Sequence, residues 1–219
     1  MTAWIPLLLQ GTITTCKIWL CSTVISLFVG ISIGTVRCSW LRTAALAVPL
    51  GILTLLLRGI PLYAQLMIVY FVLPQLTNIT FSPFTAGIIT LGLCSAAHVS
   101  EVIRGTLNSI PRGQWQAAQA LGYTNIQQLR FIILPQAFRA ALPALINEYV
   151  MVMKSTSILA SIGTLELTKM SMNIMYRSFN PLGVSLSIAG IYLALTCTVS
   201  LLGQLLERKY NVSRTKSFL

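Results

Sequence analysis

The stretch IWLCSTVISLFVGISIGTV, residues 18–36, contains nineteen residues and no charged side chain. A helix that crosses a bilayer needs about 20 predominantly apolar residues, so this stretch predicts a membrane-spanning helix. Gly30 and Gly34 are four residues apart on one face of that helix, where a second helix can approach closely. Further apolar stretches occur at about 84–103, from about 140 onward, and at about 182–206. The sequence therefore predicts an all-α integral membrane protein.

The composition agrees with a bilayer as the solvent. Of the 219 residues, 55% are apolar and 9% are charged, and the mean hydropathy is +0.79. An ordinary soluble domain has about 25% charged residues, and a water-soluble chain could not bury this much apolar surface. The composition excludes a soluble globule, a disordered chain, a coiled coil and a small module held by disulfides. The five cysteines form no C-x-x-C pair, and we expect them to pack as small apolar side chains.

The segment between the first and third predicted spans is less regular. Residues 43–57 predict a largely helical segment near the inner membrane interface, interrupted around Pro49, and residues 60–76 predict the second span. This division leaves Arg58 at the interface, because an unpaired Arg in hydrocarbon is costly. The alternative is one long broken helix with Arg58 inside it.

The fourth span is predicted to begin near Ala140 and to be interrupted at the polar residues 154–157. Lys in hydrocarbon is expensive, and Ser and Thr hydroxyls can satisfy backbone groups that a break leaves free. We therefore expect Lys154 at this break to attract a carboxylate or to pair with Glu148. The alternative is a Lys154 side chain that extends to the outer interface.

The basic residues predict the orientation in the membrane. Lys and Arg number 15 against 4 Asp and Glu. With five crossings, eleven of the fifteen fall on one face: Arg37, Arg42, Arg58, Arg104, Arg112, Arg130, Arg139, Arg208, Lys209, Arg214 and Lys216. The positive-inside rule makes this face cytoplasmic, with the N terminus outside and the C terminus inside, so the positive charge does not indicate nucleic-acid binding. We interpret 1–219 as one transmembrane domain with a cytosolic loop at 104–139 and a basic tail at 207–219.

The sequence offers little for catalysis. It contains one His, its four acids are scattered at positions 101, 148, 166 and 207, and it has no metal-ligand spacing and no nucleophile elbow. No Lys completes a phosphate-binding G-x-x-x-x-G-K-[ST] loop. We therefore expect no enzyme activity, metal or cofactor, and we expect His98 to pack or hydrogen-bond between helices. Any work driven by ATP requires a partner protein.

The polar loop contains the most specific pattern, which begins IPRGQWQAAQALGY at residues 110–123. It predicts two short helices. Gly122 suits the position just after a helix, Thr124 and Gln127 have the spacing of a capping box, and Pro135 is expected to end the second helix before the next span.

The first of these two helices has a distinct apolar face. Trp115, Ala118 and Leu121 fall on that face, while Gln114 and Gln119 lie elsewhere. Such a loop could be a solvated linker, but long structured loops between spans are usually functional, so we expect a function for this one.

This loop resembles the EAA loop of permease subunits of ATP-binding-cassette importers. The pattern of that family is Glu-Ala-Ala, three residues and Gly, followed later by Leu-Pro. Here Gln116, Ala117, Ala118 and Gly122 keep the spacing, with Gln in place of the Glu. Other segments resemble the polar amino-acid branch of the family, in the family's order between residues 10 and about 165: Gln10-Gly11-Thr12, Arg58-Gly59-Ile60-Pro61 with Gln65, Ala97-His98-Val99-Ser100-Glu101, Leu134-Pro135-Gln136-Ala137, Pro143, Asn147 and Lys154-Ser155-Thr156-Ser157.

The resemblance implies five transmembrane helices with a cytosolic two-helix coupling loop, in the cytoplasmic membrane of a bacterium. It implies an ATP-driven importer of a polar or basic amino acid, built from two permease subunits (a homodimer or a heterodimer), two cytosolic ATPase subunits and an extracytoplasmic solute-binding protein. The residues expected to couple to the ATPase are Gln114, Gln116, Ala117, Ala118, Gly122, Leu134 and Pro135. The candidate pathway residues are Arg58, His98, Glu101, Asn147, Glu148, Lys154 and Thr156.

Two other classes of protein stay open. An ion-coupled secondary carrier should show acids within its spans and often an internal repeat, but the predicted spans contain only Glu101 and Glu148, and we find no repeat. A membrane assembly or structural subunit would have no use for an ordered polar loop.

Overall fold

The computed structural model describes residues 4–39 and 44–210, and the regular structure within these ranges is helical. Four helices there are long and apolar enough to cross a membrane: α1 (Ile5–Val36), α5 (Pro83–Ser109), the continuous helix Asn125–Ile162 and α10 (Pro181–Lys209). A fifth candidate crossing is a pair of helices, Ala45–Gly59 and Leu62–Thr77, bent by 105° at the break between them. The predicted all-α membrane fold is confirmed.

The continuous helix Asn125–Ile162 consists of α7 (Asn125–Gln127), a π-helical segment (Gln128–Ile133), α8 (Leu134–Ser155) and a 3₁₀ segment (Thr156–Ile162). The remaining elements are α2 (Ala44–Gly59), α3 (Leu62–Met67), a π-helical turn (Ile68–Val72), α4 (Leu73–Thr77), α6 (Arg112–Ala120) and α9 (Leu167–Ser178).

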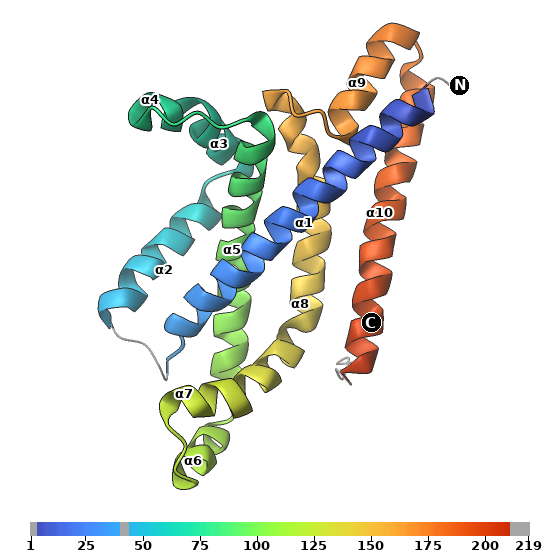
Figure 1. Cartoon of the computed structure of the whole chain (residues 1–219). Helices are drawn as coiled ribbons and strands as arrows, with labels where there is room; N and C mark the ends of the chain where they lie inside the picture. The colour runs from blue at the N-terminus through green and yellow to red at the C-terminus, as the bar shows by residue number, and fades with distance from the viewer. Residues whose placement is uncertain (1–3, 40–43, 211–219) are drawn as a thin grey trace.

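Helix α5 is the centre of the bundle. It packs most extensively on α1 and also contacts α8 and α2, while α10 packs on α8 and α9. Figure 1 shows α6 and α7 projecting at one end of the bundle, with α3, α4 and α9 at the other. Helix α1 begins at the end with α9 and α10 ends toward the end with α6, so the described chain crosses the bundle an odd number of times.

Helix α1 packs through a stripe of mostly small residues. Its buried positions recur every three or four residues: Gly11, Thr15, Ile18, Ser22, Ser26, Gly30 and Gly34. A Cβ atom on Gly30 would lie 2.6 Å from Val99, and one on Gly34 would lie 2.6 Å from the Ser100 carbonyl oxygen. The predicted close approach of a second helix is confirmed, and that helix is α5. Since lipid tails are as apolar as leucine, such close contact is what holds helices together in a membrane.

The span boundaries differ from the prediction at two helices. Residues 18–36 are the second part of a longer helix, which begins at Ile5 and continues through the exposed Lys17 without a break. Helix α5 extends to Ser109, so the predicted cytosolic loop begins about five residues later than expected, and Arg104 lies within the helix.

The predicted interruption at Pro49 is wrong. Pro49 lies inside α2, in its second turn, where the missing N–H leaves one carbonyl near the start of the helix without a partner. The interruption lies instead at residues 59–61. There the buried Gln65 Nε2 donates to the carbonyl oxygens of Leu57 at 2.7 Å and Ile60 at 2.8 Å, so one amide satisfies backbone groups that the break frees. Residues 62–77 continue as helix beyond this break, bent by 105° from residues 45–59, so the predicted second span is one arm of a bent pair.

Arg58 is also placed differently from the main prediction. It lies in the last turn of α2, about 20 Å along the helix from Ala44, and α2 runs upward beside α5 in Figure 1. The structure thus has the alternative arrangement, a broken helix with Arg58 at the break. Arg58 therefore lies away from the α6 end, where the other described residues of the predicted basic set lie.

Pro135 does not end the second loop helix. The chain continues as helix from Asn125 to Ile162, with Pro135 at the second position of α8. The π-helical segment immediately before it has wider turns, which accommodate a ring that would clash with the carbonyl four residues earlier in a regular α-helix. The fourth span therefore begins well before Ala140.

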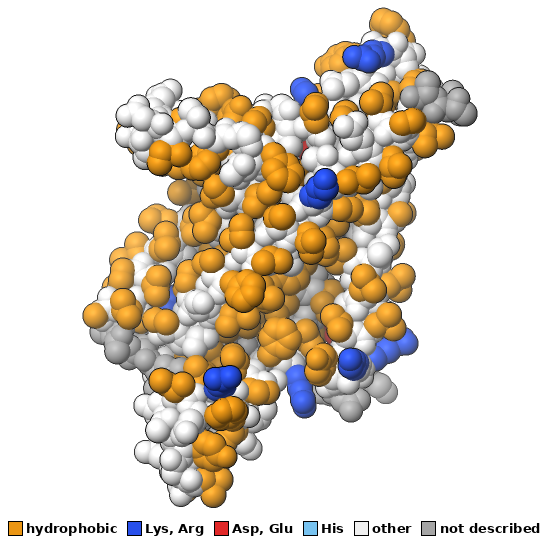
Figure 2. All heavy atoms as spheres, viewed as in Figure 1, with side chains coloured by type: hydrophobic (Ala, Val, Ile, Leu, Met, Phe, Trp, Pro, Cys, Tyr) orange, Lys and Arg blue, Asp and Glu red, His pale blue; other side chains and the backbone are white. Residues whose placement is uncertain are grey.

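The surface fits a bilayer environment. In Figure 2, hydrophobic side chains cover the middle of the visible face, and most of the Lys and Arg side chains lie toward its two ends. Three residues of the predicted cytoplasmic basic set, Arg42, Arg214 and Lys216, lie outside the described residues.

We predict that Gly30→Leu lowers the thermal stability of the purified protein strongly, because the added side chain would overlap Val99. Overpacking of this kind costs about 1–3 kcal/mol. The matched control is Gly190→Leu in α10, since a Cβ at Gly190 meets no atom within 4 Å. Equal melting temperatures for the two variants in detergent would contradict the helix packing described above.

Candidate functional site

A cavity of about 380 Å³ lies where the broken helix meets α5 and α8. Residues 57–62, at the corner between α2 and α3, form one wall. Ligand-binding cavities in proteins are typically about 300–1,000 Å³, so the size suits a small molecule.

The other two walls are single faces of straight helices. Helix α5 contributes Leu91, Cys94, Ser95 and His98, and α8 contributes Glu148, Met151, Val152 and Ser155. In both helices the spacing is i, i+3, i+4, i+7, the spacing of one helix face. The cavity is therefore lined by mainly apolar side chains with a few polar groups placed among them.

The polar groups of this cavity carry opposite charges. Arg58 and Glu148 both line it, yet they do not pair with each other, because both ion pairs among the described residues are made by Glu101. Ser95 is 2% exposed, and its hydroxyl oxygen has no hydrogen-bond partner in the described part of the chain. A buried hydroxyl without a partner is costly unless a ligand or water satisfies it. The cavity is thus lined by a cation and an anion that do not pair with each other, and by a buried serine whose hydroxyl has no partner within the described ranges.

Of the seven candidate pathway residues, the structure brings three together in this cavity: Arg58, His98 and Glu148. Asn147 is exposed on α8 and does not line it. Thr156 is buried and donates to the Met153 carbonyl oxygen at 2.7 Å, within its own helix.

Lys154 lines a different cavity, of about 400 Å³, with Ser157, Thr168 and Tyr192. Lys154 and Glu148 are six residues apart on one helix, which separates their directions by about 120°. The predicted pairing of these two side chains does not form.

The predicted interruption at 154–157 is a change of helix type, from α to 3₁₀. Thr156 and Ser157 donate to carbonyl oxygens three residues earlier, at 2.7 and 2.8 Å. The hydroxyls therefore satisfy backbone acceptors at the transition, as expected.

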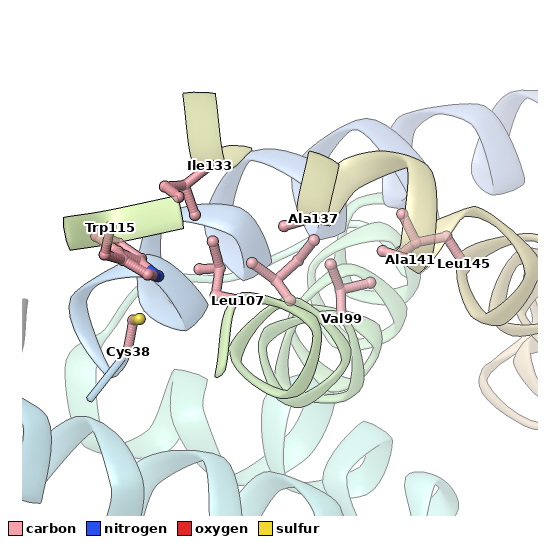
Figure 3. Packing of buried hydrophobic residues seen from close by; sticks show 9 residues of the cluster. Cys38, Val99, Leu107, Trp115, Ile133, Ala137, Ala141 and Leu145 are labelled. Atoms are coloured by element: carbon pink, nitrogen blue, oxygen red, sulfur yellow. The ribbon is translucent and has the colours of Figure 1, made fainter. Parts of the chain in front are cut away.

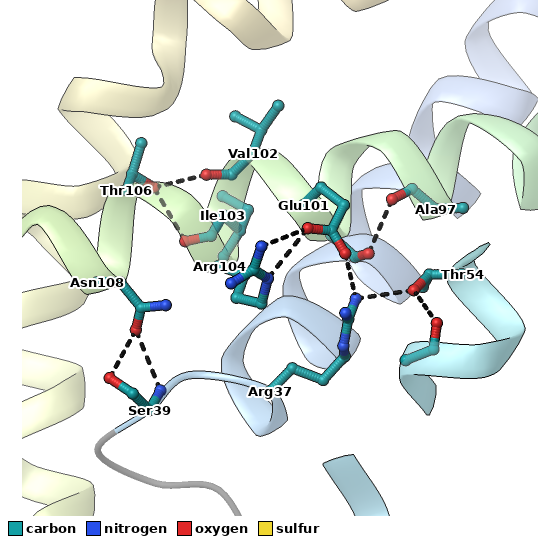
Figure 4. Close-up of polar contacts among 12 residues, drawn as sticks. Arg37, Ser39, Thr54, Ala97, Glu101, Val102, Ile103, Arg104, Thr106 and Asn108 are labelled. Carbon is teal, nitrogen blue, oxygen red and sulfur yellow. Dashed lines mark hydrogen bonds and ion pairs between the residues drawn. The ribbon is translucent and has the colours of Figure 1, made fainter. Parts of the chain in front are cut away.

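Glu101 belongs to a charged cluster below the cavity rather than to its lining (Figure 4). Its Oε1 atom lies 2.5 Å from Arg37 Nη1, and its Oε2 accepts from Arg104 Nη2 at 2.7 Å and Nε at 3.0 Å. One carboxylate thus links α1 with α5, and it is fully engaged by two guanidinium groups.

Glu166 is a structural acid that the sequence analysis left without a role. It is fully buried at the start of α9, where it accepts from the backbone N–H groups of Thr168 at 2.8 Å and Lys169 at 2.7 Å, and from Tyr192 Oη at 3.0 Å. Burial raises the pKa of the Glu166 carboxyl, and these hydrogen bonds oppose the rise. Glu166 caps α9 and ties it to α10, so the only acid that lines the 380 Å³ cavity is Glu148.

The loop helix α6 is fixed to the bundle by one aromatic side chain (Figure 3). Trp115 is 3% exposed and packs in a cluster with Cys38, Leu107 and Ile133, which come from the ends of α1, α5 and the π-helical segment. Ala118 is 1% exposed on the same inward face. Helix α6 therefore has a defined orientation on the bundle.

The outward face of α6 carries three of the seven predicted coupling residues, and Gly122 follows just after the helix. Gln114, Gln116, Ala117 and Gly122 are exposed, whereas Ala118 faces the bundle and is not available to a partner here. In α8, Pro135 is exposed and Leu134 is half-buried.

Leu121 does not continue the apolar face of α6, because it lies beyond the last helical residue and is 75% exposed.

The predicted end of the first loop helix and the predicted start of the second are confirmed. Gly122 has φ +80°, and the N–H groups of Gly122 and Tyr123 donate to the carbonyl oxygens of Gln119 and Ala118, at 3.0 and 3.2 Å. This is the hydrogen-bond pattern of a Schellman motif. Thr124 and Gln127 form the capping box.

The sequence analysis missed Ser95, Ser155 and the role of Gln65. The first two could have been found by helical counting, since Ser95 is three residues before His98 and Ser155 is seven after Glu148. No pattern within the segment signals that the Gln65 amide turns back onto the preceding helix.

Comparison with known proteins agrees with this geometry. The family described as the binding-protein-dependent transport system inner membrane component matches residues 12–212. The arginine transport system permease protein ArtQ of Bacillus subtilis is 37% identical over 206 residues, which are 94% of this chain and 93% of that protein. The glutamine transport system permease protein GlnP of Escherichia coli is 33% identical over 211 residues, covering 95% and 94% of the two chains.

Solved structures of ABC transporters have a similar fold. A crystal structure of an amino acid ABC transporter with histidines has a TM-score of 0.86 and 32% identity, and the match covers 95% of this chain and 96% of that one. An inward-facing MetNI methionine ABC transporter has a TM-score of 0.85 at 18% identity, covering 98% and 100% of the chains, which shows the shared fold. This chain belongs to the family of binding-protein-dependent transport system inner membrane components.

Proposed function

We propose that this chain is the permease subunit of an ATP-driven importer of amino acids and that the cavity between the broken helix, α5 and α8 is its translocation site. The observation that carries the proposal is the placement of Arg58 and Glu148 in one cavity without a direct ion pair. A free amino acid carries a carboxylate and an ammonium group on one carbon. Arg58 offers a charge-assisted contact to the carboxylate, and Glu148 offers one to the ammonium group.

The substrate class is supported by the cavity and by the relatives together. The printed names of the two relatives at 37% and 33% identity refer to arginine and glutamine. Ser95 and His98 add neutral hydrogen-bonding groups to the cavity wall, which suits a polar side chain. We therefore propose a polar or basic amino acid as the substrate.

The coupling residues lie where an ATPase could bind them. We propose that the outward face of α6, with Gln114, Gln116 and Ala117, sits in a cleft of a cytosolic ATPase subunit, which supplies all ATP hydrolysis. A second permease subunit completes the pore, and an extracytoplasmic binding protein delivers the substrate. A rigid helix held by Trp115 can transmit movement of the ATPase to α5 and α8.

The orientation follows from the same assignment. The end with α6 is cytoplasmic, the N terminus is extracytoplasmic and the C terminus is cytoplasmic. The proposed membrane is the cytoplasmic membrane of a bacterium, and the bias of basic residues toward the α6 end supports this orientation.

An ion-coupled carrier is less consistent with the acids. Glu101 is held by two Arg side chains and Glu166 caps a helix, which leaves Glu148 as the single cavity acid.

Uptake by the reconstituted complex tests the function. Proteoliposomes that contain this chain with its partner permease, ATPase and binding protein should accumulate radiolabelled glutamine, arginine or histidine only when ATP is present. Uptake driven by a proton or sodium gradient without ATP would contradict the proposal.

We predict that Arg58→Gln and Glu148→Gln each raise the KM for amino-acid transport by about tenfold or more. Loss of a hydrogen bond to a charged group costs about 1.5–3 kcal/mol, and 1.4 kcal/mol corresponds to a factor of ten. The matched control is Asn147→Ala, next to Glu148 but outside the cavity, which should leave the KM unchanged. Equal KM values for all three variants would show that the cavity does not bind the substrate.

We predict that Ala117→Leu weakens association with the ATPase and reduces transport, because it adds bulk to the exposed face of α6 while Trp115 keeps the helix in place. The control is Ala194→Leu, an equal change at an exposed position of α10. Co-purification of the ATPase with each variant is the measurement. If the ATPase co-purifies equally with both variants, the proposed binding of α6 in a cleft of the ATPase is wrong.

A further inference from the structure

We infer that Arg37 is a positioning residue for this cavity, because it holds α2, and with it the wall that carries Arg58, against α5. The inference rests on the proposed function only in taking the cavity as the translocation site.

Helix α2 has little apolar packing to fix its position. Thr54, at 1% exposed, is the only buried side chain among its described side chains. Six large hydrophobic residues of α2 are 45–68% exposed: Leu46, Val48, Ile52, Leu53, Leu55 and Leu56. Few side chains of α2 are closely packed, so specific polar contacts contribute to fixing the position of α2 on α5.

Arg37 supplies that contact (Figure 4). Its Nη1 donates to Thr54 Oγ1 at 2.8 Å and lies 2.5 Å from Glu101 Oε1. The guanidinium group also lies over Gly51, since a Cβ there would be 3.6 Å from Nη2. Arg37 thus lies between α2 and α5, bonded to Thr54 and facing Gly51 one turn earlier in α2.

Arg37 is itself fixed on α5. The following residues, Cys38 and Ser39, are anchored there, because Asn108 Oδ1 accepts from the Ser39 N–H at 3.1 Å and from its hydroxyl at 2.9 Å, and Cys38 is fully buried. Arg104 holds the other carboxylate oxygen of Glu101. The Arg37–Glu101 ion pair therefore joins the end of α1 to α5, and α2 is attached to this ion pair through Thr54.

The hydrogen bond from Arg37 to α2 is weaker than the ion pairs that join Arg37, Glu101 and Arg104. Arg37, Glu101 and Arg104 are joined by ion pairs, while Arg37 holds α2 by one hydrogen bond to Thr54. The other polar contacts of α2 are at its far end, where the Leu57 carbonyl oxygen meets Gln65 and Cys94. Leu57 and Arg58 follow Thr54 by three and four residues, on the same face of α2, and both line the cavity. Loss of the hydrogen bond between Arg37 and Thr54 would therefore let the cavity wall that contains Arg58 move, while α1 and α5 stay packed together.

Cross-linking in the assembled complex tests this positioning role. Cys94 Sγ lies 3.9 Å from the Leu57 carbonyl oxygen, so Leu57→Cys and the native Cys94 report the distance between α2 and α5. Cys16, Cys21 and Cys197 are replaced by Ala, and the fully buried Cys38 is kept. The rate of cross-linking by a short bifunctional thiol reagent is measured with and without Thr54→Val.

Thr54→Val should slow cross-linking by about tenfold, because a hydrogen bond to a charged group is lost. It should also raise the transport KM more than it lowers kcat. Arg37→Met should act in the same direction, and Arg37→Lys should recover part of the effect. The matched control is Thr90→Val, a buried Thr in α5 that bonds only within its own helix, which should change neither quantity.

A cross-linking rate and a KM for Thr54→Val equal to those of the control would overturn the inference. Its failure is distinguishable from failure of the proposed function. If the unsubstituted complex transports amino acids but Thr54→Val leaves the cross-linking rate unchanged, only the positioning role is wrong. If that complex transports no amino acid, the proposed function is wrong, and the cross-linking rates still decide whether Arg37 holds α2.

Discussion

The close approach of α1 and α5 is the interaction on which the rest of the structure depends. At Gly30 and Gly34 the two helices touch so closely that a methyl group on either glycine would overlap α5. A bilayer gives no hydrophobic advantage to helix contact, so van der Waals contact over such a stripe, together with interhelical hydrogen bonds, must hold the pair. Once the pair is formed, α2, α6 and α8 each pack on it, and the cavity lies where α2 and α8 meet α5.

The polar groups divide into those that hold the fold and those left for a ligand. Glu101 and Glu166 are satisfied by guanidinium groups and by helix N–H groups, and Gln65 satisfies the carbonyls at the break in the α2 pair. Arg58, Glu148 and Ser95 line one cavity, where the two charged side chains do not pair with each other and the Ser95 hydroxyl has no partner among the described residues. Because buried polar groups are costly when unmatched, their concentration at one place is the physical argument for a binding site.

Much of this could be predicted from sequence because the deciding signals are local. Charge-free stretches indicate spans, Gly30 and Gly34 indicate a helix contact, and Gly122 with the pair Thr124 and Gln127 indicates helix ends. The prolines were misleading because their effect depends on context. Pro49 lies near a helix start, where little is lost, and Pro135 follows π-helical turns that accommodate its ring. The separation of Glu101 and Lys154 from the cavity depends on contacts with Arg37 and with the region around Tyr192, which are distant in sequence.

The accessibility of Cys94 tests most directly whether the cavity is the translocation site. Cys94 lines the cavity beside Ser95, and a protein that lacks Cys16, Cys21 and Cys197 leaves it as the reactive thiol, since Cys38 is fully buried. The rate of its modification by a small thiol reagent is measured in the reconstituted complex at increasing amino-acid concentration. The account predicts that a transported amino acid slows modification and that the protection saturates near the transport KM. An unchanged rate at saturating substrate would contradict it.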